Sequence, residues 1–178
     1  SSPPSSNLTG RQFPDLRCCA AMNDLPDSAK RVADAAAAAG LAISIVEMPD
    51  STRTAEDAAA ACGCQVAQIV KSLVFVGANT QTPYLLLVSG ANRVDEQAMA
   101  AILGEALERP NGRTVRDITG YAIGGIPPLG HPVHMPTVID EKLLEFDTVW
   151  AAAGTPRCVF SSDPAALAAA TKARRHIF

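Results

Sequence analysis

The sequence lacks long stretches of large apolar residues. Its runs of this kind are short, such as residues 73–76 and 84–88, whereas a helix needs about 20 apolar residues to cross a bilayer. The first residues also lack the apolar core of a signal peptide. We therefore expect a soluble protein that has no membrane partner.

An excess of positive charge is also missing. The formal net charge is −3, which argues against nonspecific affinity for nucleic acid, because that affinity comes mostly from Lys and Arg neutralising phosphates. A polynucleotide partner must therefore meet a local basic patch. The two candidate groups are Arg109, Arg113 and Arg116, and Lys172, Arg174, Arg175 and His176. The second group is also explained by cations in the last turn of a helix, where they complement the helix dipole.

The cysteines do not form a disulfide framework. Their number is odd and their spacing irregular: Cys18, Cys19, Cys62, Cys64 and Cys158. Such usage favours reduced thiols and a cytoplasmic location. Cys62 and Cys64 could form a metal clip, but no second Cys/His pair stands at structural-zinc spacing. We expect no metal and no cofactor.

The chain divides into a short extension and one domain. Residues 1–25 are rich in serine and proline and have little apolar periodicity, so we expect a loosely ordered extension. Met22 lies just before the first helix signal, which suggests the hypothesis that natural translation begins there. Residues 26–178 have enough apolar content to form one hydrophobic core without disulfide bonds or a structural metal ion.

Periodicity and capping residues predict the elements of this domain. Helices are expected over residues 27–39, from a Thr54 cap to Gly63, over 92–103, over 111–118 and from Pro164 onward. Strands are expected over residues 42–47, 69–76, 83–88, 137–140, 146–153 and 158–160. The mixture without strict alternation predicts an α+β or mixed α/β domain around one mostly antiparallel sheet flanked by helices.

Lys71 is the least explained residue of the predicted strands. It stands in an otherwise almost wholly apolar run, and Lys71, Leu73 and Phe75 should face one side of the sheet. Burying the ammonium there is costly unless an anion or acceptors meet it. The alternative is a lysine at a strand end that extends its ammonium into water.

Residues 120–136 contain too many glycines and prolines for a helix or a central strand, so we expect a loop of defined shape. Its glycines allow close approach of a ligand, and backbone N–H groups in such a loop could meet a carbonyl or an oxyanion. An ordinary structural crossover is the alternative.

His131 and His134 are expected at the surface, with binding of water or a hydroxyl as the alternative. Asp140 could cap the following helical turn or take part in catalysis.

Several enzyme classes are excluded by missing motifs. The sequence has no Gly-x-Ser-x-Gly elbow, no phosphate-binding loop of the Walker type and no dinucleotide-binding glycine fingerprint.

The segments around Lys71 and the glycine-proline loop resemble the YbaK/ProX family. The similarity covers about residues 27–173 and is carried by residues 68–73 and 120–131, supported by 91–95 and 153–154. This family comprises free-standing relatives of the editing domain of bacterial prolyl-tRNA synthetase. The resemblance implies metal-free deacylation of tRNA, usually tRNA(Pro), that carries a wrong small amino acid such as alanine.

The resemblance also implies a site. Lys71 would hold the acceptor-end backbone or the aminoacyl group, while residues 124–128 would seat the aminoacyl ester and the terminal adenosine. Ile126 and Pro127 stand where several relatives have Cys-Ser or Ile-Ser, so a hydroxyl is absent here. The predicted catalytic residues are Lys71, Gly124 and Gly125. The predicted substrate-binding residues are Ser72, Ile126, Pro127, Pro128, His131, Asp140 and Gly154.

Three functional hypotheses follow from the sequence. The first is an editing hydrolase whose partners are the acceptor end of mischarged tRNA and prolyl-tRNA synthetase. The second is a module of the same fold that binds tRNA or a synthetase without turnover. The third is a metal-assisted hydrolase that uses His131, His134 and a cysteine.

Overall fold

The computed structural model describes residues 25–178. The expectations for residues 1–24, including the loose extension, the start at Met22 and the thiols of Cys18 and Cys19, lie outside this range. The last residue assigned to the extension, Leu25, is only 6% exposed and packs in the core. The packed domain therefore includes Leu25.

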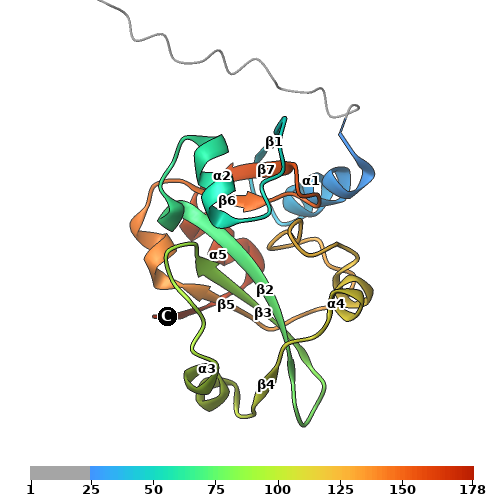
Figure 1. The fold of residues 1–178 in the computed structure, drawn as a ribbon, viewed down its shortest axis with the longest axis vertical. Helices are drawn as coiled ribbons and strands as arrows, with labels where there is room; N and C mark the ends of the chain where they lie inside the picture. The colour runs from blue at the N-terminus through green and yellow to red at the C-terminus, as the bar shows by residue number, and fades with distance from the viewer. Residues whose placement is uncertain (1–24) are drawn as a thin grey trace, which may run out of the picture.

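One sheet runs through the described chain (Figure 1). Its strands are β1 (Ser44–Glu47), β2 (Ile69–Gly77), β3 (Pro83–Ser89), β4 (Leu107–Glu108), β5 (Thr137–Asp140), β6 (Val149–Ala152), β7 (Cys158–Ser162) and β8 (Arg174–His176). Their order is β1-β7-β6-β2-β3-β5-β8, and β4 also pairs with β2. Within residues 25–178, four pairings are antiparallel and three are parallel. The predicted mixed domain is confirmed.

The helices begin and end largely where their capping residues predict. They are α1 (Asp27–Ala38), α2 (Ala55–Cys62), α3 (Glu96–Leu103), α4 (Gly112–Thr119) and α5 (Pro164–Thr171), with short 3-10 helices η2 (Val66–Gln68) and η3 (Glu141–Glu145). The Thr54 and Asn111 side chains accept backbone N–H groups at the starts of α2 and α4. Gly63, Gly104 and Gly120 end α2, α3 and α4 in the left-handed conformation that glycine adopts without strain.

The central strands bury side chains on both faces of the sheet. Leu85 and Leu87 of β3 join a core with α1 and α5, while Leu86 and Val88 join a second core with Met99 of α3. The period of two expected for a strand therefore divides an uninterrupted apolar run between two layers.

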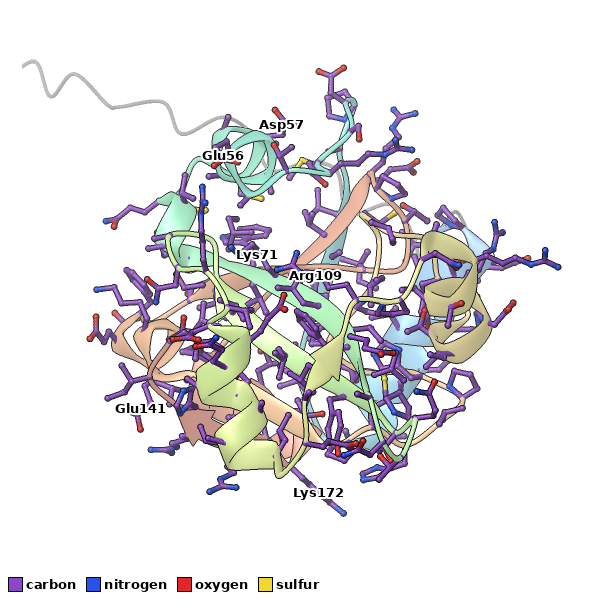
Figure 2. All side chains as sticks on the ribbon, turned by 60° about the horizontal axis from the view of Figure 1, so that its bottom comes forward. Glu56, Asp57, Lys71, Arg109, Glu141 and Lys172 are labelled. Carbon is purple, nitrogen blue, oxygen red and sulfur yellow. The ribbon has the colours of Figure 1, made fainter. Side chains whose placement is uncertain are left out.

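The C-terminal cations do not lie in a helix, contrary to the prediction. Helix α5 ends at Thr171, and Lys172 adopts the left-handed conformation. Arg174 to His176 then form β8, which pairs in parallel with β5 at the edge of the sheet. Pairing with β5 determines that this segment is a strand, and local periodicity does not reveal such pairing. In Figure 2, Lys172 lies far from Lys71 and Arg109.

Candidate functional site

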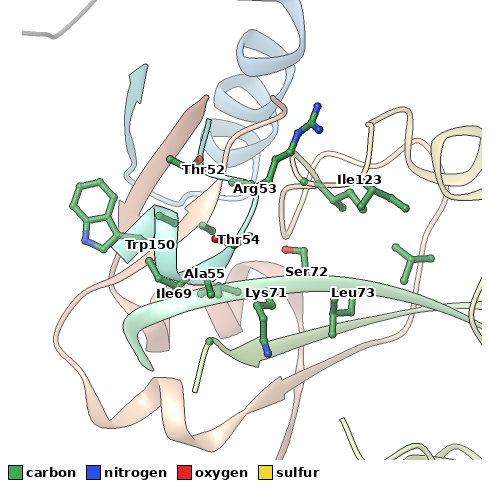
Figure 3. A pocket seen from close by; sticks show the side chains of 18 of the residues that line it. Thr52, Arg53, Thr54, Ala55, Ile69, Lys71, Ser72, Leu73, Ile123 and Trp150 are labelled. Atoms are coloured by element: carbon green, nitrogen blue, oxygen red, sulfur yellow. The ribbon is translucent and has the colours of Figure 1, made fainter. Parts of the chain in front are cut away.

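A large cavity lies along an open edge of β2 (Figure 3). Its volume is about 980 Å³. On this edge β2 pairs with β6 only at Ile69 and Val70, and with β4 only at Val76 and Gly77. Within the described chain, the stretch between these two pairings has no neighbouring strand on that side. The cavity lies in the gap between these two pairings.

The register of β2 shows which backbone groups face the gap. The carbonyl of Ile69 accepts the N–H of Gly90, on the β3 side, and residues of an antiparallel ladder alternate in the direction of their backbone groups. The N–H and C=O groups of the odd-numbered residues of β2 therefore bond to β3, whereas those of Ser72 and Val74 point toward the cavity. The open edge can donate and accept hydrogen bonds.

Ser72 contributes an unused hydroxyl. Its Oγ atom is buried and has no hydrogen-bond partner within residues 25–178. Lys71 and Leu73 point to one side of β2 and Ser72 to the other (Figure 3), as the predicted alternation requires. A buried hydroxyl without a partner is costly, so a ligand in this cavity would satisfy it.

Lys71 lies half-buried at the cavity. Its Nζ atom donates a hydrogen bond to the backbone carbonyl oxygen of Asn92, at 2.5 Å. Burial lowers the pKa of the Lys71 ammonium, the negative charges of Glu56 and Asp140 oppose this shift, and the positive charge of Arg93 adds to it. An ammonium has three donors, so two remain for a ligand after the bond to Asn92.

The predicted glycine-proline loop has no helix or strand over residues 122–136. Gly124 and Ile126 line the cavity, whereas Pro127 and Pro128 are buried and do not line it. Gly124 has a φ of +93°, and a Cβ atom there would lie 3.0 Å from Cγ of Arg53. The loop thus presents only part of its predicted set of residues to the cavity.

Gly125 and Gly154 connect this loop to the turn after β6 through a backbone hydrogen bond. The N–H of Gly125 donates to the carbonyl of Ala122, and its own carbonyl accepts the N–H of Gly154, both at 3.0 Å. A Cβ atom on Gly125 would lie 2.7 Å from the carbonyl carbon of Thr155, and one on Gly154 would lie 2.7 Å from the carbonyl oxygen of Ser28. Close backbone packing requires glycine at both positions.

His131 is only partly exposed, so the expected surface position holds for part of the residue and not for its ring nitrogens. Both ring nitrogens are buried, and neither has a partner of normal hydrogen-bond geometry in the described chain. The ring packs edge-on against Tyr121, with centroids 5.8 Å apart. Desolvation by burial lowers the pKa of His131 to about 4, although the backbone of Pro127 and Thr119 opposes the shift. His131 does not line the cavity.

Asp140 caps η3, which is one of the two roles expected for it, by accepting the N–H of Lys142. It is only 1% exposed and does not line the cavity. Direct contact with a ligand in this cavity is therefore not available to its carboxylate in this structure.

Several cations and two aromatic residues, Phe75 and Trp150, line the cavity. Arg109, from the first predicted basic group, lines it, but Arg113 and Arg116 do not. The Arg109 side chain bonds to Glu96 at 2.5 Å and lies over the Phe75 ring, 5.4 Å from its centroid. Sequence reasoning gave no role at the site to four lining residues, Arg53, Asn92, Arg93 and Trp150, although Asn92 and Arg93 belong to the segment 91–95 that supports the resemblance.

Metal and membrane sites find no support in residues 25–178. No group of three or more His, Cys, Asp or Glu side chains there could hold a metal ion. Burial, and next the neighbouring Cys64, raises the pKa of the Cys62 thiol to about 12, which disfavours the thiolate that binds metals. No helix in this range is long and apolar enough to span a bilayer.

Comparison with known proteins places the chain in a family. The model of the aminoacyl-tRNA editing domain matches residues 49–170, and the chain belongs to this family. A crystal structure of a protein provisionally assigned as a trans-editing enzyme for prolyl-tRNA synthetase is 47% identical, with a TM-score of 0.81, covering 86% of this chain and 97% of that one.

Two further structures share the fold. One comes from the computational design of scaffold proteins that present linear epitopes; it is 44% identical, with a TM-score of 0.81 and coverage of 86% and 97%. The other is the hypothetical protein APE2540, which is 28% identical, with a TM-score of 0.77 and coverage of 83% and 97%. The predicted family is confirmed.

Proposed function

We propose that this chain is a trans-editing deacylase that hydrolyses the ester of mischarged tRNA, with tRNA(Pro) carrying alanine or a similarly small residue as its main substrate. The family and the 47% identical relative support this proposal. The observation that carries it is the open edge of β2, which offers to one cavity the Lys71 ammonium and the Ser72 hydroxyl, for which residues 25–178 provide no hydrogen-bond partner.

In this proposal the acceptor end enters through the cationic mouth of the cavity. Arg53, Arg93 and Arg109 line the cavity around Lys71 and can neutralise phosphates locally although the net charge is −3. Lys71 then holds the acceptor-end backbone or the aminoacyl group. Trp150 also lines the cavity and offers an aromatic surface on which an unpaired base can stack.

The aminoacyl group meets the inner part of the cavity. Val74 and Ile126 are buried and line it beside the free backbone groups of β2. These side chains favour a small, apolar amino acid, although one methylene is worth only about 1–3 kcal/mol of discrimination. Water attacks the ester carbonyl, with help from the substrate's own ribose hydroxyl, since the cavity presents no paired nucleophile and base.

The test is deacylation of tRNA(Pro) charged with alanine, cysteine, serine or 2-aminobutyrate. We expect Lys71→Ala to lower the rate for the preferred substrate by roughly 10²–10³-fold, the usual cost of removing one electrostatic contact to the reacting group. Lys142→Ala is the matched control, because Lys142 is exposed and pairs with Glu145. Wild-type turnover in Lys71→Ala contradicts the role of Lys71. Binding of charged tRNA without release of amino acid by the wild type would instead favour the noncatalytic binding module.

A further inference from the structure

Asp140 makes more hydrogen bonds than its cap of η3 requires. Its Oδ1 atom accepts the N–H of Lys142 at 3.0 Å. Its Oδ2 atom accepts the backbone N–H of Ser89 at 3.1 Å and the side-chain amide of Asn92 at 2.8 Å. The second oxygen therefore binds the last residue of β3 and the segment that connects β3 to α3, which lie in a different part of the chain.

Asn92 joins this carboxylate to Lys71. Its side chain donates to Asp140, and its backbone carbonyl accepts the hydrogen bond of the Lys71 ammonium. The lysine side chain is flexible, so a fixed acceptor at the cavity wall limits the positions of its ammonium. Asp140, which is buried and does not line the cavity, holds this acceptor in place through the Asn92 side chain.

We infer that Asp140 is a positioning residue for Lys71, which acts by holding Asn92 so that its carbonyl directs the Lys71 ammonium into the cavity. This inference rests on the proposed function, in which that ammonium meets the aminoacyl end of tRNA. It gives the buried carboxylate a role at the site without any contact with substrate. The competing explanation is that Asp140 only stabilises the fold by capping η3.

The first test compares two capping aspartates. Asp140→Asn has nearly the same shape, but its NH₂ group must face at least one of the three donors that the carboxylate now accepts. Asp163→Asn is the matched control, because Asp163 caps α5 through the N–H groups of Ala165 and Ala166. We expect Asp140→Asn to lower kcat by roughly 10- to 100-fold with KM nearly unchanged, as for a misplaced catalytic group. The control should retain the wild-type kcat.

A double-mutant cycle separates positioning from stability. If Asp140 acts through Lys71, adding Asp140→Asn to Lys71→Ala causes no further loss of single-turnover rate. Losses that multiply would overturn the inference, because a structural role is independent of the lysine. Asn92→Ala removes only the link, leaving the Asp140 bonds to Ser89 and Lys142, and should reproduce the loss of kcat even if Asp140→Asn folds poorly.

A labelling experiment tests the link without activity. The chain has four lysines, Lys30, Lys71, Lys142 and Lys172, and mass spectrometry can follow the acylation rate of each. We expect Lys71, relative to Lys30, to react severalfold faster in both Asn92→Ala and Asp140→Asn. Unchanged labelling in both variants overturns the inference. Wild-type turnover in Lys71→Ala would instead refute the proposed role of Lys71, so the two failures are distinguishable.

Discussion

Replacement of Gly125 by alanine should damage both the stability and the activity of this domain. The added Cβ atom would lie 2.7, 2.8 and 3.0 Å from three backbone atoms of Thr155, and backbone cannot rotate away as a side chain can. Overpacking of this kind costs roughly 1–3 kcal/mol. For a domain of this size, the corresponding fall in Tm is roughly 2–12 °C.

The activity should fall for a related reason. Gly125 and Gly154 join the loop to the turn after β6, so relief of the clash moves Gly124 and Ile126, which line the cavity. A displacement of 1 Å at a site can cost roughly 10²-fold in rate. We therefore expect Gly125→Ala to deacylate far more slowly even at temperatures where it is fully folded.

The assay combines thermal unfolding with single-turnover deacylation. Gly112→Ala is the matched control: it adds the same methyl group at the first residue of α4, where the new Cβ atom would lie 3.5 Å from Cδ1 of Ile123, an ordinary contact. Alanine is also the better helix former, so this control should melt no lower than the wild type. If Gly125→Ala had wild-type Tm and wild-type rate, the proposed fastening role of Gly125 would be refuted.

Two titratable groups with lowered pKa values give further predictions. Hydrogen bonds, first those from Thr80, lower the pKa of Glu105 from 4.5 to about 2; its contribution to stability is complete above about pH 4.5 and is lost as the pH falls toward 2. Glu105→Gln should therefore weaken the decline of the urea midpoint over this range, and an unchanged decline would contradict the assignment. Burial lowers the pKa of His131 from 6.5 to about 4, so the folded state binds fewer protons than the unfolded state and His131 destabilises the fold as the pH falls below about 6.5. An NMR titration should show its imidazole neutral at pH 6, whereas a midpoint near 6.5 would contradict its burial.

Local chemistry was enough to predict most elements of the fold. The side chains of Thr54 and Asn111 accept hydrogen bonds from free N–H groups at the starts of α2 and α4, and glycines end α2, α3 and α4. A few neighbouring residues therefore determine these boundaries. The start of α3 was predicted too early, because Asp95 rather than Asn92 caps it. The amide of Asn92 is instead bound to Asp140, 48 residues away.

Pairing between distant segments could not be predicted in this way. The cations at Arg174 and Arg175 suit a helix end as well as an edge strand, and only the proximity of β5 decides between them. The same holds for His131, because its burial depends on how the loop folds over Tyr121. Lining residues such as Arg53 and Trp150 carry no local motif, and they reach the cavity only through the order of the strands.

The location of the cavity follows from the two partial pairings of β2. Strand β6 pairs with the beginning of β2, and the two-residue strand β4 pairs with its end. Neither pairing extends to Ser72 or Val74. A continuous neighbour would have paired the backbone groups of Ser72 and Val74 and filled the space beside Lys71. A sheet edge normally invites aggregation, but here the flanking strands limit the opening to a few residues. The gap leaves a short edge with free backbone groups at Ser72 and Val74 beside Lys71, and the proposed editing reaction depends on that edge being open.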